Sequence, residues 1–168
     1  MAIRDSILPE LDHELATTRK LLERVPDAQA EWQPHPKSMT LGKLAIHLAT
    51  LPRWAATTMK QTELDMNPPG GQPMVLPTFE STAATLALFD QVAAEGRAAI
   101  AAAEDGDFMV PWALKNAGQQ IFAMPRLNVL RSFVLNHLIH HRGQLSVYLR
   151  LHDVPIPSIY GPSADEAS

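Results

Sequence analysis

The sequence has no cysteine among its 168 residues. It can therefore form no disulfide framework, and it offers no thiol as a nucleophile or metal ligand. We expect the cytoplasm as the default compartment of such a chain. The stretch from Met1 to Ser6 leads into an amphipathic pattern and lacks the apolar core of a signal peptide, so we expect no leader there.

Charge and long apolar runs are also scarce. Charged residues make up 19% of the chain, the net charge is −4, and no basic block is present. These features argue against nucleic acid or an anionic membrane as a partner. No apolar run approaches the length that spans a bilayer. Hydrophobic residues at 46% suit one compact globule, and we expect residues 1–168 to form a single domain.

Apolar residues recur at helical spacing in four long stretches, which predict helices at 4–24, 38–64, 78–103 and 125–152. Pro52 lies inside the second stretch and should kink that helix. Residues 107–124 are expected to be an ordered loop or short irregular element, and residues 153–168 an extended tail. These elements predict an all-α fold, a four-helix bundle with long inter-helix connections.

The most informative stretch runs from Asn136 to Gln144 and holds three of the seven histidines within five residues. We set the polar face of its helix by Asn128, Arg142, Ser146 and Arg150. At about 100° per residue, His137 then points directly away from that face, and His141 lies about 40° further round, one turn along. Two such imidazoles can hold one metal ion if another element supplies a third ligand.

Other polar residues near this pair have different expected positions. His140 is displaced about 60° to the other side of His137 and should support the ligands or lie on the flank of the bundle. Gln144 is close to the inward pole and can hydrogen-bond a ligand or a bound water, and Tyr148 shares the inward stripe. Arg142 and Arg150 should face outward. His47 lies on the flank of the apolar stripe of the second helix, and periodicity alone does not place it in the core.

Two familiar metalloprotein classes do not fit the motif. A zincin needs glutamate directly after its first histidine, and Leu138 stands there. A haem bundle would need axial ligands on both sides of a porphyrin, whereas His137 and His141 lie on one face of one helix.

Two stretches carry a resemblance to a known family. They are residues 31–49, from Glu31-Trp32-Gln33-Pro34 through Ser38–Gly42 to Ala45-Ile46-His47-Leu48-Ala49, and residues 136–163. A single histidine in the second helix is followed far downstream by His-x-x-x-His and then Arg-Gly-Gln. In these stretches, and in the order and spacing of its helices, the chain resembles the DinB/YfiT-like family of bacterial four-helix-bundle metalloproteins.

The resemblance implies a divalent-metal site of three histidines, which correspond here to His47, His137 and His141. It implies an activity related to the thiol-dependent S-transferases that use bacillithiol or mycothiol, or to metal-dependent hydrolases, and it implies a homodimer. Zinc or nickel would be the expected ion, with iron, manganese or copper as alternatives that imidazole also accommodates.

Three neutral imidazoles leave a metal with an open position, which can bind water or a substrate thiol and lower its pKa. In the transferase hypothesis a low-molecular-weight thiol attacks an electrophilic carbon, and Gln144 and Tyr148 orient the ligand. In the hydrolase hypothesis the water attacks and His140 accepts its proton. The residues expected in catalysis are therefore His140, Gln144 and Tyr148. A non-catalytic metal-sensing or stress-related module is the third hypothesis.

Overall fold

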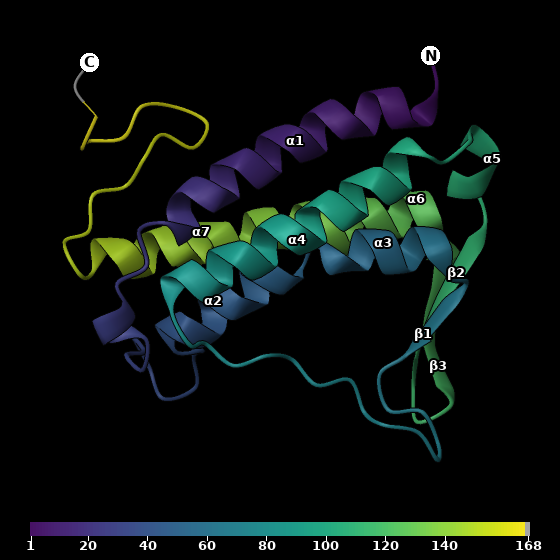
Figure 1. Ribbon diagram of the computed structural model, residues 1–168, viewed down its shortest axis with the longest axis horizontal. Coiled ribbons are helices and arrows are strands. Elements are labelled where there is room, and N and C mark those ends of the chain that lie inside the picture. The colour runs from purple at the N-terminus through teal and green to yellow at the C-terminus, as the bar shows by residue number, and fades with distance from the viewer. Residues whose placement is uncertain (167–168) are drawn as a thin grey trace.

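The computed structural model describes residues 1–166 of the chain (Figure 1). Long helices run side by side and enclose the main hydrophobic core, and a small sheet lies at one end of them (Figure 1). The helical elements are α1 (Ile3–Leu22), a 3-10 turn (Asp27–Gln29), α2 (Leu41–Thr50), α3 (Arg53–Lys60), α4 (Thr82–Ala101), α5 (Asp105–Phe108), α6 (Arg126–Val129), a π-helical segment (Leu130–Leu135) and α7 (Asn136–Arg150).

The second predicted helix is split into α2 and α3 at Pro52. Thr40 begins α2, because its hydroxyl accepts a hydrogen bond from the Lys43 N–H at 3.3 Å. Pro52 has no N–H to donate to the preceding turn, so α2 ends at Thr50 and α3 begins at Arg53. The predicted kink is confirmed. The predicted helix ran on to residue 64, but Glu63–Asp65 form a strand instead.

The prediction of an all-α four-helix bundle is wrong, because the chain also forms a three-stranded sheet. Strand β1 (Glu63–Asp65) pairs in parallel with β2 (Pro111–Asn116), and β2 pairs antiparallel with β3 (Gln119–Pro125). Residues 107–124, expected to be irregular, therefore hold a β-hairpin. Its turn is Ala117-Gly118, with φ of 50° and 77°, the left-handed pair that suits a two-residue hairpin.

The hairpin owes its stability to a second, smaller core. Trp112 and Leu114 alternate inward along β2 and pack with Val129 of α6. Partly buried aromatic rings surround them, including Phe122, which stacks on Phe133 at 4.7 Å between ring centroids. Burial of this apolar face explains why a stretch with little helical periodicity is ordered as a sheet.

The fourth predicted helix is continuous in direction but includes the π-helical segment between α6 and α7 (Figure 1). A π turn closes i→i+5 hydrogen bonds, so a helical wheel carried across it slips by about one residue, or roughly 100°. The predicted outward position of Arg142 is wrong, because Arg142 itself was used to define the polar face; within α7 it lies at helical spacing from the buried Leu138, Leu145 and Leu149. Arg142 is 1% exposed, whereas Arg150 is exposed as predicted.

Arg142 joins α7 to α1 and to the C-terminal tail. Its Nη1 lies 2.6 Å from Glu14 Oε2, and its Nη2 donates to the Tyr160 hydroxyl at 2.7 Å. Tyr160 in turn donates to Glu14 Oε1 at 2.9 Å. Residues 153–166 contain no helix or strand and run across the end of α7 near α1 (Figure 1), while residues 167–168 of the predicted tail lie outside the described residues.

Within residues 1–166, none of the helices has the length and apolar character needed to cross a membrane.

Candidate metal centre

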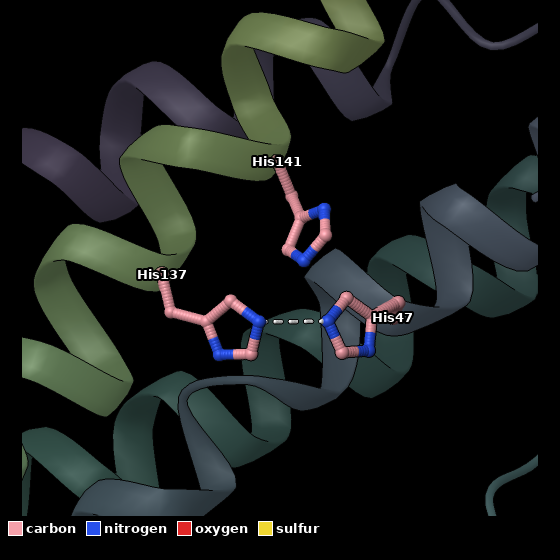
Figure 2. A group of neighbouring side chains, drawn as sticks. All are labelled: His47, His137 and His141. Carbon is pink, nitrogen blue, oxygen red and sulfur yellow. Dashed lines mark hydrogen bonds between the residues drawn. The ribbon is translucent and has the colours of Figure 1, made fainter. Parts of the chain in front are cut away.

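Three histidines from two helices meet inside the bundle. His47 projects from α2, and His137 and His141 project from successive turns of α7 toward it (Figure 2). One ring nitrogen from each of the three lies within 4.8 Å of the other two. The Nε2 atoms of His47 and His137 are 3.2 Å apart. Packing of α2 against α7 therefore settles the position of His47, which periodicity left open.

The spacing of these nitrogens is compatible with a divalent cation. Two nitrogens bound about 2.05 Å from a tetrahedral ion lie roughly 3.3 Å apart. The His47–His137 separation of 3.2 Å is close to that value, and one ring nitrogen of His141 lies within 4.8 Å of both. Imidazoles are also the ligands that zinc, nickel and iron accept. The three residues could thus hold one metal ion, and the group has three members, which leaves room for a further ligand.

Local helix geometry explains why His137 and His141 are paired. Residues four apart lie on the same face of an α-helix, one turn from each other. The ring centroids of His137 and His141 are 4.7 Å apart, and that of His47 is 5.0 Å and 4.4 Å from them, respectively. The face they share is bordered by Leu138 and Leu145, which are both fully buried. The three rings therefore lie at the edge of the main core.

Gln144 fixes the orientation of His141. The Oε1 atom of Gln144 lies 2.7 Å from His141 Nδ1, and its Nε2 atom lies 3.2 Å from His140 Nε2. Because an amide oxygen only accepts, His141 donates from Nδ1, and its Nε2 lone pair is left for a metal. The amide nitrogen then donates to His140 Nε2. Gln144 thus links His141 to His140 through its amide group.

Burial keeps the three rings neutral. Loss of solvent, followed by repulsion from His141 and His137, lowers the pKa of His47 from 6.5 to about 4. Burial is also the main cause that lowers the pKa of His137 and of His141, although hydrogen bonds to Phe133 and to Gln144, respectively, oppose it. Metal binding requires the neutral imidazole, so the site presents its ligands in the required form at pH 7.

The other two residues expected in catalysis lie further from the centre. His140 is exposed, with its ring centroid 4.8 Å from that of His141. Tyr148 is half-buried, packs edge-on against Trp32 and donates from its hydroxyl to the Met39 carbonyl at 3.4 Å. The structure thus brings His140 and Gln144 together with His141, and it places Tyr148 beside the loop that precedes α2.

Sequence reasoning missed the residues behind His141. Arg142 of α7, the residue after His141, forms a buried ion pair with Glu14 of α1. Glu14 lies between Leu11, Leu15 and Thr18 on the buried face of α1, and an acidic residue on an apolar stripe was the signal that could have found it.

Comparison with known proteins shows the family of the chain and relatives of its fold. The profile described as the DinB superfamily matches residues 10–145. The chain belongs to the DinB superfamily. This DinB-superfamily chain is 27% identical over 164 residues to the uncharacterized protein YrdA of Bacillus subtilis (strain 168), covering 96% of this chain and 90% of YrdA.

Solved structures show the same DinB-like fold. A DinB-like protein from Bacillus cereus ATCC 10987 superposes with a TM-score of 0.71 and 24% identity, over 95% of this chain and 98% of that one. The DinB-like protein YjoA of Bacillus subtilis gives a TM-score of 0.70 and 16% identity, over 94% and 98% of the two chains. At these identities the likeness concerns the fold.

Proposed function

We propose that this DinB-superfamily protein is a metal-dependent enzyme of the thiol-dependent S-transferase type, in which His47, His137 and His141 hold a divalent cation. The observation that carries the proposal is the convergence of three ring nitrogens from two helices within 4.8 Å. Zinc and nickel are the ions we expect first, since both accept three imidazole ligands.

A divalent cation at this site would supply Lewis acidity, which lowers the pKa of a thiol or a water in its remaining position. The protein's own residues do the positioning. Neutral imidazoles leave the charge of the cation undiminished, Gln144 holds His141 in the tautomer that exposes Nε2, and His140 holds Gln144. The chain has no cysteine, so a thiol nucleophile would come from a small-molecule cosubstrate.

The test uses the full-length protein purified without a histidine tag and loaded with zinc or nickel. Metal content, metal affinity and conjugation of cysteine, bacillithiol or mycothiol to a panel of electrophiles are measured together. His47→Ala should lose both metal binding and conjugation. His35→Ala, which changes an exposed histidine in the loop before α2, is the matched control and should lose neither. A stoichiometric metal site without any thiol conjugation would contradict the transferase part of the proposal.

The second candidate is a hydrolase that uses water at the same centre. The observation in its favour is the exposed His140, 4.8 Å from His141 between ring centroids, which could accept a proton. However, His140 Nε2 already accepts a hydrogen bond from the amide nitrogen of Gln144, and this contact favours a positioning role for His140. Turnover of esters, amides or lactones that is lost in His140→Ala, with zinc affinity retained, would select this candidate. Metal binding that stabilises the fold without turnover would select a non-catalytic module.

We further propose that the protein is a homodimer. In support, Val147 of α7 and Leu151, the residue that follows this helix, lie one turn apart and are 57% and 59% exposed, an apolar pair that a second copy could cover. Light scattering after size exclusion should give twice the monomer mass, and Val147→Glu should reduce it to the monomer mass.

A further inference from the structure

A pocket of about 430 Å³ opens beside His47. It lies between the first turns of α2, the loop before this helix and the connection at residues 66–81. This connection has no helix or strand and returns along the bundle from β1 to α4 (Figure 1). This volume is within the range of small-molecule sites. Because His47 lines the pocket, a molecule bound there would lie next to the metal centre.

The wall of the pocket is mainly apolar. Its apolar members are Met39, Ile46, Leu76, Pro77 and Phe79. Phe79 anchors the connection on α2, since a Cβ built on Gly42 would stand 3.0 Å from the Cβ and Cγ atoms of Phe79. Glycine at position 42 therefore lets the aromatic ring pack against the helix and form one side of the pocket. The hydrocarbon part of a ligand is the group that such a wall would accept.

Two charged residues, Lys43 and Glu31, also line the pocket, and both are exposed. Neither forms an ion pair within residues 1–166. Lys43 lies four residues before His47, on the same face of α2 and about one 5.4 Å turn away. The backbone N–H groups of residues 41–43 already donate to oxygens of the chain, so recognition of an anion falls to the Lys43 ammonium.

The charges decide which ligand fits. Lys43 and Glu31 cancel each other formally, and the three histidines are neutral, so a bound divalent cation leaves the region net positive. We propose that the pocket binds an apolar carboxylate, with its hydrocarbon part between Ile46 and Phe79 and its carboxylate at Lys43. This inference rests on the metal-dependent function proposed above and names the class of its second substrate.

The experiment measures binding by isothermal titration calorimetry on the zinc-loaded full-length protein. The probes are octanoate, acetate, octylammonium and 1-octanol. Acetate has no hydrocarbon chain, so it measures the binding of a carboxylate to the metal alone. Octanoate should bind at least about tenfold more tightly than acetate, because the pocket covers its chain. Octylammonium should bind more weakly than octanoate, since it would be repelled by the cation and by Lys43.

Variants separate the pocket from the metal centre. Lys43→Gln should weaken octanoate binding about two- to fivefold, the effect of losing an exposed ion pair, and leave 1-octanol binding unchanged. Lys43→Arg should retain octanoate binding. Lys20→Gln, an exposed lysine on α1, is the matched control and should have no effect.

The outcomes keep the two proposals apart. The pocket inference would be overturned if octanoate bound no more tightly than acetate or octylammonium, or if Lys43→Gln did not change its affinity. Normal zinc affinity in the same experiment would leave the proposed metal centre standing. Absence of zinc binding in the unaltered protein would overturn the proposed function, and with it the reason to expect an anionic ligand.

Discussion

Each imidazole of the metal centre is controlled by a different neighbour. His141 is held through Nδ1 by Gln144, His137 faces His47 at 3.2 Å between Nε2 atoms, and His47 is kept neutral mainly by burial. Such contacts set which nitrogen carries a proton and where the other points. The orientation of the three rings therefore depends on their neighbours, including Gln144, which is not a member of the cluster.

Replacing Gln144 tests this control. Gln144→Leu removes the acceptor of the His141 Nδ1–H and should weaken zinc affinity about 10- to 100-fold. Gln144→Glu keeps an oxygen acceptor and should retain most of the affinity. Zinc affinity is measured by competition with a chromogenic chelator. Equal affinities for the unaltered protein and the leucine variant would show that His141 is oriented by packing alone.

The lowered pKa values also make the metal-free protein sensitive to acid. The pKa of His47 is about 4 in the folded chain and 6.5 ordinarily, so below pH 6.5 the unfolded chain binds more protons than the folded one. The free energy of unfolding should therefore fall as the pH drops from 6.5 toward about 4, and His137 and His141 act in the same direction.

Urea titrations of the metal-free protein between pH 4 and 7.5 measure this dependence. His47→Gln should flatten the curve, because the replaced side chain does not titrate. His35→Gln, in the exposed loop, should leave the slope unchanged. If the slope were identical in the unaltered protein and in His47→Gln, the pKa of His47 would be the same in the folded and the unfolded chain.

Among the helices and strands, close approach of backbones shapes the bundle as much as apolar periodicity does. A Cβ added at Gly96 of α4 would stand 2.7 Å from the Pro52 carbonyl oxygen and 3.0 Å from the Ala55 Cβ. The break that Pro52 introduces between α2 and α3 therefore turns a carbonyl toward α4, and only glycine leaves space for it.

Gly96→Ala should lower the free energy of unfolding by about 1–3 kcal/mol, the usual effect of overpacking. Gly143→Ala is the matched control in another helix, because a Cβ there meets nothing within 4 Å. That control should be neutral or raise stability by up to about 1 kcal/mol through the higher helix propensity of alanine. Chemical denaturation measures both. Equal effects of the two substitutions would contradict the tight contact between α3 and α4.

For the molecule as a whole, the buried group of Arg142, Glu14 and Tyr160 connects three distant parts of the chain. It joins α1, the ligand helix α7 and the C-terminal tail (Figure 1). Burial, with the Glu14 hydrogen bond next, raises the pKa of Tyr160, which keeps its hydroxyl able to donate. The tail is thus attached next to the metal centre, one residue beyond His141.

Arg142→Met should lower the free energy of unfolding by about 3–5 kcal/mol, since it leaves the Glu14 carboxylate buried without a partner. The double variant Glu14→Leu/Arg142→Met should recover much of that loss. Arg97→Met, which breaks an exposed pair with Asp12, should leave the denaturation midpoint nearly unchanged. If Arg142→Met and Arg97→Met behave alike, the buried group does not stabilise the fold.

The sequence by itself determined what is local. His137 and His141 are four residues apart, so a helix places them on one face. Pro52 interrupts the second helix, and the spacing of apolar residues marks the long helices. The hairpin was missed because its turn is Ala-Gly and not the Asn-Gly or Asp-Gly pair that signals a two-residue hairpin, although the alternation along β2 was readable.

Tertiary structure alone decided what is non-local. His47 is 90 residues from His137, and only the packing of α2 on α7 brings their rings together. Arg142 can be buried because α1 and the C-terminal tail supply Glu14 and Tyr160 as its partners, and no helical wheel of α7 contains them. The physical reason is the same in both cases: periodicity reports which face of an element is apolar, while the partner of that face is chosen by the fold as a whole.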